Sequence, residues 1–442
     1  MRKLTTFIFA IGFGMIANAQ SSLNLHGLTH LTQSLETNPA FLPDSRFTFG
    51  VGTSSFKFGL SSVASVNDIF GSQLSPNESL ELVLSNLQTN NQVALSSQVT
   101  PFVMGVRFGE NKFLTVGLNS HFQTNLALPA NLLSMLYFGN ADYIGQRVGL
   151  DAIEFNLNTY SEAYVGVSFP VGDKLRVGIK GQYLLGHANA STLKSSGYIE
   201  TDSSYTITVN SDITFQTSNV PIDSATRSNF DYSSAAYGNN RGTAISFGLT
   251  YELNENVTLN ASLIDIGSIT WKDEVADYEV IGNYELEPFD PQGDSSNYTD
   301  QIVDTLKAVF LPQKVERGAY KSKIFPATYL GATYLTAWGH EVGGRAYLRF
   351  FEESTYYAVG VNYKAGLGRW FYVNPSYAAI NGDFVNFGMG VGIRALGLDV
   401  YFLTDNLEDA LAYYDSKTMN FQFGLQFTFK PKKPQAIQPV EF

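Results

Sequence analysis

The chain has 442 residues, carries a net charge of −12 and contains no cysteine. Disulfides, thiolate metal sites and cysteine nucleophiles are therefore excluded, and the acidic balance argues against nucleic acid as a partner, because a nucleic-acid binder needs a basic face. Only 15% of the residues are charged, against roughly 25% in ordinary soluble domains, and no long apolar stretch follows the first residues. This composition favours strands that cross a membrane over membrane helices or a soluble core.

The first residues have the pattern of a secretory signal peptide. Met1-Arg2-Lys3 is followed by an apolar run from Phe7 to Ile16 and then by Ala17-Asn18-Ala19. A charged start, a short apolar run and an A-x-A site predict export and removal of residues 1–19. No cysteine follows the cleavage site, so a lipoprotein anchor is not expected. Residues 20–44 then precede the first predicted strand. This segment is too long to be only a leader to that strand.

Alternation of apolar and polar residues with a period of two recurs along most of the remaining chain. In the last such stretch, every odd position from Met419 to Phe429 is apolar, and the even positions hold Asn, Gln, Gly, Gln and Thr. One apolar face for lipid and one polar face for a lumen are typical of membrane β-strands. A soluble sandwich or propeller also alternates, but its outer face would carry many Lys and Glu residues, which are scarce here.

These stretches predict an all-β fold, a transmembrane antiparallel up-and-down β-barrel of about 14 strands within residues 45–430. Tight turns alternate with long loops along the chain. Bacterial barrels place tight turns in the periplasm, so both termini are expected there, and residues 61–90, 128–148, 194–240, 273–319 and 406–416 are expected outside the cell. The strands are expected at residues 45–60, 91–108, 112–127, 149–171, 174–193, 241–253, 256–272, 320–336, 339–352, 354–365, 368–380, 383–395, 397–405 and 417–430.

The long loops contain further predicted elements. Helical spacing at Leu80–Leu87, Leu132–Leu136 and Ile302–Val309 predicts helical insertions that fold over the barrel mouth. Residues 198–217 alternate again and predict a hairpin that rises above the membrane.

The C-terminal end follows the last strand with Lys430-Pro431-Lys432-Lys433-Pro434. Proline has no backbone donor, so strand pairing must stop there. Residues 431–442 are therefore predicted to form an extended periplasmic tail.

Basic residues are predicted on the polar, lumen-facing side of several strands. One interpretation is an anion-favouring constriction or a dock for an acidic periplasmic partner. The interpretation we favour is a set of internal ion pairs with Glu154, Glu162, Glu252 and Asp399 that stiffens the lumen. The basic residues are Arg107, Arg176, Lys180, Arg345, Arg349, Lys364 and Arg394, with Lys430 at the end of the last strand.

Catalytic and metal sites are not expected. A barrel hydrolase would need a histidine beside a serine, and the nearest candidates are His121 after Ser120 and His187 opposite Thr159. Neighbourhoods this loose arise by chance. The acidic residues Asp290, Asp294 and Asp300 lack the spacing of a calcium-binding loop. We therefore expect no enzyme, no cofactor and no metal.

Several motifs resemble known families. Asn38-Pro39-Ala40, which lies between the signal and the first strand, resembles the plug motif of the long-chain fatty-acid transporter (FadL) type of barrel. It also resembles related barrels of the type IX secretion and gliding apparatus of Bacteroidota. Leu25-His26-Gly27-Leu28, residues 178–186, 265–271 and 404–407 are similar to a Bacteroidota outer-membrane family known only as a domain of unknown function. The resemblance implies that residues 20–44 form a short N-terminal plug.

Two functions remain open for this outer-membrane protein, which has membrane lipid as a partner in either case. The plug-and-barrel resemblance implies a gated and largely occluded conduit for hydrophobic or amphipathic small molecules, which we favour. The family likeness also allows a non-transporting binding or scaffold subunit that meets other envelope proteins. An apolar cavity beside the plug or a lateral gap between strands would favour the conduit. A filled lumen with an exposed apolar patch on loops or turns would favour the scaffold.

Overall fold

The computed structural model describes residues 22–62, 65, 67, 90–220, 238–286, 312–350, 355–368, 370–380, 383–411 and 416–429. The predicted signal peptide and the predicted tail lie outside these residues. The wall strands are β1 (Phe47–Ser61), β2 (Asn90–Phe108), β3 (Lys112–Pro129), β5 (Glu154–Val171), β6 (Leu175–Thr201), β8 (Arg241–Glu252), β9 (Val257–Trp271), β13 (Ala327–Leu335), β14 (Glu341–Phe350), β15 (Thr355–Leu367), β16 (Phe371–Ile380), β17 (Asp383–Ala395), β18 (Leu398–Thr404) and β19 (Thr418–Phe429).

Within the described residues, these strands form a closed antiparallel barrel of 14 strands, as predicted. Each strand pairs with the next along the chain, and β1 closes the circle by pairing with β19 from Phe47↔Phe429 to Ser61↔Thr418. Closure leaves no free edge, so the backbone groups of every wall strand can be satisfied by neighbours in a lipid environment.

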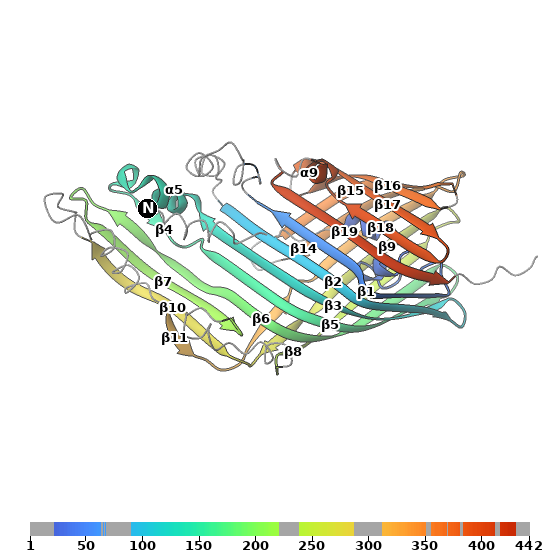
Figure 1. Ribbon diagram of the computed structural model, residues 1–442, viewed down its shortest axis with the longest axis horizontal. Helices are drawn as coiled ribbons and strands as arrows, with labels where there is room; N and C mark the ends of the chain where they lie inside the picture. Colours follow the sequence, from blue (N-terminus) through green and yellow to red (C-terminus); the bar gives the residue numbers. More distant parts are fainter. Residues whose placement is uncertain are drawn as a thin grey trace, which may run out of the picture.

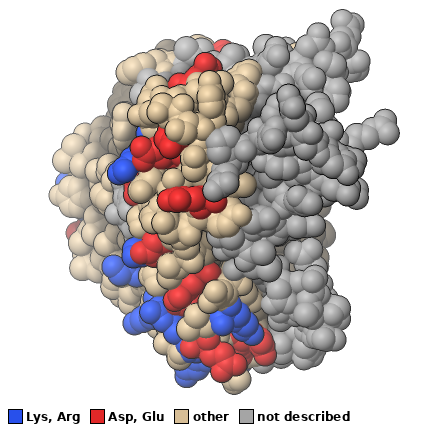
Figure 2. All heavy atoms as spheres, turned by 90° about the vertical axis from the view of Figure 1, so that its left-hand side faces the viewer, with Lys and Arg blue, Asp and Glu red and all other residues tan. Residues whose placement is uncertain are grey.

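At one end of the barrel the strands extend beyond the wall, and at the other end short turns join them. Strand β6 has 27 residues, and its outer part forms the predicted hairpin with β7 (Ile207–Ser218). Strands β4 (Arg147–Gly149), β10 (Val275–Leu286) and β11 (Gln313–Glu316) widen this extension, which Figure 1 shows at its left-hand end. Figure 2 shows acidic and basic side chains intermixed on that end, where Arg147 and Lys194 pair with Glu200 and Asp212.

Short helices also lie in the connections at this end. They are α5 (Ala130–Phe138), η2 (Ala141–Tyr143) and α9 (Leu407–Leu411). The predicted helical stretch Leu132–Leu136 falls in α5, whereas Leu80–Leu87 and Ile302–Val309 lie outside the described residues. In the part of the chain that the structure describes, no helix is long and apolar enough to cross a membrane.

One predicted strand is wrong as a single element. Residues 320–336 form two strands, β12 (Tyr320–Ile324) and β13, which meet different parts of β9. The break falls at Pro326, because proline cannot donate a hydrogen bond to the ladder. The strand predicted at 149–171 begins only at Glu154.

The wall has an apolar outer face and a polar inner face, as the alternation predicts. On the outer face, Leu118 and Val165 are 46% and 55% exposed, whereas the inward neighbour Asn119 is buried. At the seam of the barrel, Phe427 stacks on Phe49 of β1 with 4.9 Å between ring centroids. Such an apolar, aromatic exterior is the surface that lipid requires of a membrane barrel.

Residues 22–44, here called the inner segment, occupy the lumen. The segment contains α2 (Leu23–His26) and the 3-10 helix η1 (Thr32–Glu36), and nearly every residue from Leu23 to Pro43 is buried. Figure 1 shows this dark blue segment enclosed by the strands. The inner segment is therefore the feature that positions the candidate site.

Candidate functional site

The first half of the inner segment packs against apolar and aromatic side chains of the late strands. Leu25, Leu28 and Leu31 are fully buried and form one cluster with Tyr372, Tyr401 and Leu403 of β16 and β18. Leu23 joins a second cluster in which Tyr329 and Tyr347 lie 4.7 Å apart between ring centroids. Leu25, Leu28 and Leu31 recur every three residues in the sequence, so the turns of the inner segment present these three side chains to the same cluster.

The second half of the inner segment is held by polar contacts with the early strands. Glu36 accepts hydrogen bonds from Lys57 of β1 at 2.5 Å and from Gln98 of β2 at 3.0 Å, and both side chains of the ion pair are less than a tenth exposed. The hydroxyl of Thr32 lies 2.8 Å from that of Thr48. These contacts were not predicted from the sequence, although the inward position of Lys57 in the alternation of β1 is a signal for them.

The Asn38-Pro39-Ala40 motif lies against the inner face of β6, β8 and β9. The Asn38 side chain accepts a hydrogen bond from the Ala40 backbone at 2.9 Å and donates to the carbonyls of Leu249 and Ala261, each at 3.3 Å. A Cβ atom on Gly248 would lie 2.0 Å from the Asn38 Oδ1 atom, and one on Gly178 would lie 2.1 Å from the Pro39 backbone. The motif can approach the wall so closely because these two positions lack a side chain.

His26 lies where the two halves of the inner segment meet. Its Nε2 atom is 2.7 Å from the Asn260 Oδ1 atom, its Nδ1 atom is 2.9 Å from the Thr37 hydroxyl, and its ring stacks on Tyr329. Burial, and next the nearby Arg345 guanidinium, lower the pKa of His26 to about 3. The imidazole is therefore neutral at the pH of most environments, and protonating it would place a charge beside a buried cation.

Seven of the predicted lumen cations lie within the described residues and each has a partner there, and three of them contact the inner segment. Arg107 donates to the carbonyl of Pro43, Arg345 donates to that of Leu23, and Arg394 lies between Asp44 and Asp399. The other partners are Ser168 for Arg176, Glu162 and Asp265 for Lys180, the Phe325 carbonyl for Arg349, and Glu341 for Lys364. Lys430 lies outside the described residues.

The two candidate neighbourhoods, His121 with Ser120 and His187 with Thr159, do not form a site. Successive residues of a strand point to opposite faces, so Ser120 faces outward while His121 faces the lumen and lies 3.0 Å from Glu162. His187 does not meet Thr159. It is the extra residue of a β-bulge and lies 2.7 Å from the Ser161 hydroxyl on the outer face.

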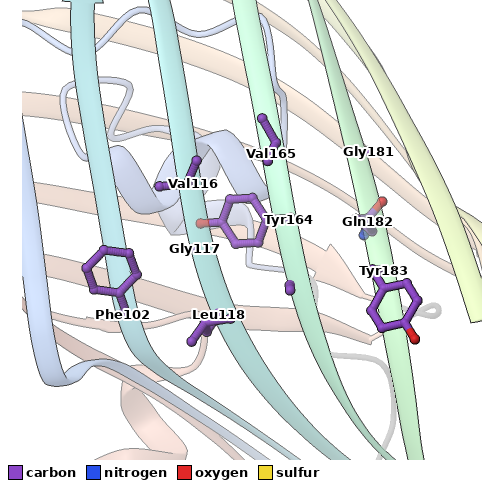
Figure 3. A pocket seen from close by; sticks show the side chains of 10 residues that line it. Phe102, Val116, Gly117, Leu118, Tyr164, Val165, Gly181, Gln182 and Tyr183 are labelled. Atoms are coloured by element: carbon purple, nitrogen blue, oxygen red, sulfur yellow. The ribbon is translucent and has the colours of Figure 1, made fainter. Parts of the chain in front are cut away.

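The outer wall carries a groove beside that serine. It has a volume of about 610 Å³ and lies across β2, β3, β5 and β6, where Phe102, Leu118, Val165 and Tyr183 surround small residues. Figure 3 shows these side chains on neighbouring strands. The ladder between β3 and β5 is continuous through this region, so the groove is a depression in the wall and not a gap between strands.

Comparison with known proteins places the chain in a family. No curated protein matches it. In fold it is similar to a FadL homologue of Pseudomonas aeruginosa, with 8% identity over 94% of this chain and 99% of that one and a TM-score of 0.46. It is also similar to the toluene transporter TbuX of Ralstonia pickettii, with 10% identity over 94% of this chain and 100% of that one and a TM-score of 0.46. The family of unknown function DUF5723 matches residues 39–405, as the family resemblance led us to expect, and the chain belongs to this family.

Proposed function

We propose that the protein is a gated conduit of the outer membrane for hydrophobic or amphipathic small molecules, and that the inner segment is its gate. The observation that carries this proposal is the kind of contact that holds the segment. Among the described residues, every hydrogen bond between residues 22–44 and the wall involves at least one side chain, and none is a backbone ladder bond. Displacement of the segment would therefore break no ladder bond of the barrel wall.

The chemistry of the lumen supports the class of solute. Leucine and tyrosine side chains line one side of the inner segment, and the Glu36–Lys57 pair and its amide neighbours line the other. A solute with an apolar body and one polar group would find partners for both parts along this path. A barrel of this strand number also has more interior space than its wall side chains alone can fill.

A disulfide that fixes the inner segment to the wall tests the gate. The chain has no cysteine, so Thr32→Cys/Thr48→Cys gives one possible disulfide between η1 and β1, at positions whose hydroxyls lie 2.8 Å apart. We expect oxidised protein in liposomes to admit an amphipathic, membrane-impermeant dye at least tenfold more slowly than the reduced protein. Planar bilayers should show no large steady conductance until residues 22–44 are deleted.

The matched control places the same disulfide within the wall. Ser120→Cys/Ser161→Cys joins β3 to β5, where the two hydroxyls lie 3.2 Å apart on the outer face. Oxidation of this variant should leave dye entry unchanged. Equal dye entry before and after oxidation of the Thr32–Thr48 pair would remove the inner segment from the proposed role.

A second candidate is a scaffold subunit of an envelope assembly. Two large apolar side chains project from the short turns, since Trp338 is 80% exposed and Leu396 is fully exposed. They supply the kind of apolar surface that a protein partner would cover. Co-purification tests this alternative: a stoichiometric partner lost in the Trp338→Ser/Leu396→Ser variant would support it, and recovery of the barrel without any partner would count against it.

A further inference from the structure

A row of polar side chains crosses the outer face of the barrel at one height. The strand registers place its members side by side, because each is the direct partner of the next across β3, β5, β6, β8, β9 and β12. Only Leu185 interrupts the polar character. The row runs Ser120, Ser161, Leu185, Arg241, Thr270 and Lys321.

Three cations belong to this part of the outer face. Lys321 and Lys323 are exposed, and they point outward because Tyr320 and Ser322, which alternate with them, bond to Asn189 and Trp271 inside. Arg241 lies on β8 across from Thr270, the neighbour of Lys321. Within the part of the chain that the structure describes, none of the three forms an ion pair with an acidic residue.

The row lies about one membrane-crossing length away from the short turns. A strand needs about 9–11 residues to cross a bilayer, and β8 has 12, with Arg241 at the end away from its short turn. Below Arg241, the outward residues Phe247 and Leu249 are 42% and 46% exposed. If the short turns lie in the periplasm, as the proposed outer-membrane location implies, the row meets the headgroups of the outer leaflet.

The groove described above begins one residue pair below this row. Ala163 is the partner of Leu118 on one side and of Tyr183 on the other, directly beneath Ser161. A Cβ atom on Gly181 would meet no atom within 4 Å, so the groove is open toward the bilayer (Figure 3). An apolar groove that faces lipid and ends at a row of hydroxyl groups has the shape and polarity to hold an acyl chain and its polar head.

We propose that this face binds a phosphorylated, multiply acylated glycolipid of the outer leaflet, namely lipopolysaccharide. Arg241, Lys321 and Lys323 bind its phosphates, and the groove takes an acyl chain. Arg241 and Lys321 are two strands apart, about 10 Å, which suits a lipid with more than one phosphate. The hydroxyl groups of Ser120 and Ser161, with the His187 ring beside them, bond to the sugar or ester oxygens.

Binding to purified full-length barrel tests the phosphate contacts. Lipid A with two phosphates is titrated in detergent micelles, and native mass spectrometry measures the bound fraction. Near a membrane surface each Lys contributes about 1 kcal/mol, so Lys321→Gln/Lys323→Gln should weaken binding about thirtyfold. The control Lys112→Gln/Lys174→Gln makes the same change of charge at the short turns and should bind as the unchanged protein does.

Two further arms identify the lipid. Dephosphorylated lipid A should bind at least tenfold more weakly than the phosphorylated form, and phosphatidylglycerol should not compete at equal concentration. Gly181→Trp should weaken lipid A binding by filling the groove, whereas Val359→Trp, on the outer face of β15, should not. Equal binding of both lipid A forms, equal loss in both double variants, or effective competition by phosphatidylglycerol would overturn the proposal. Dye entry through the lumen should be the same in all these variants.

Discussion

The two halves of the inner segment are held by different chemistry. Residues 23–31 pack leucines among the tyrosines of the late strands and add hydrogen bonds of Asn24 and His26, whereas residues 32–44 carry the buried ion pair between Glu36 and Lys57, hydroxyl contacts and the asparagine motif. Apolar contacts tolerate small displacements because they have no direction, while buried charges and hydrogen bonds require defined positions. The second half is therefore expected to anchor the segment, and the first half to be the part that moves.

The largest expected effect comes from breaking the buried ion pair. Lys57→Met leaves the Glu36 carboxylate buried without its cation, and removal of one partner of such a pair costs about 3–5 kcal/mol. The opening free energy of residues 22–44, measured by hydrogen exchange in the folded barrel, should fall by that amount. The double variant Glu36→Gln/Lys57→Met should recover most of the loss. Full stability of Lys57→Met would mean that the second half is not the anchor.

The opening free energy of the first half, residues 23–31, should fall less when one buried side chain is truncated. Leu28 is fully buried, and truncation of a buried leucine costs about 2–5 kcal/mol, toward the lower limit where neighbours can relax into the space. We expect Leu28→Ala to lower the opening free energy of residues 23–31 by about 2 kcal/mol and to leave exchange of residues 32–44 almost unchanged. Equal opening of both halves would show that the segment moves as one unit.

Acid should loosen the junction between the halves through His26. Burial, and next the Arg345 guanidinium, lower its pKa in the folded protein to about 3, below the ordinary value of 6.5. Between these values the released segment binds a proton that the docked segment does not, so docking weakens as pH falls below 6.5, by about 1.4 kcal/mol per pH unit. From pH 7 to pH 5 the loss is about 2 kcal/mol.

Limited proteolysis of residues 22–44 across this pH range measures the effect. His26→Asn should abolish the pH dependence, and His340→Asn, at an exposed position on a short turn, should retain it. Identical pH profiles for the unchanged protein and His26→Asn would contradict the assignment to His26.

The smallest effect is expected at Thr32. Thr32→Val removes the hydrogen bond to the Thr48 hydroxyl at 2.8 Å, and such a bond contributes about 1 kcal/mol. The midpoint temperature at which the inner segment becomes susceptible to protease should fall slightly. Thr32→Val/Thr48→Val should restore much of the shift, because neither hydroxyl is then left unpaired.

The wall of the barrel can be predicted from the amino-acid sequence alone. Inward and outward positions follow from a period of two, and the ends of most strands follow from local turn residues such as Gly109 and Gly172, so both can be recognised without knowledge of distant contacts. The exception at Pro326 also has a local cause, since proline cannot donate a hydrogen bond to the ladder there.

The contacts inside the wall and on its outer face depend on the tertiary structure. The partnership of Glu36 with Lys57, the fit of Asn38 against Gly248 and the meeting of Ser161 with His187 depend on strand register, on a bulge and on the path of a segment through the lumen. These residues are far apart in sequence, and no local pattern specifies which inward or outward side chains meet. A one-residue shift of register would reverse the face of every side chain on a strand, so the identity of the site depends on the closed barrel as a whole.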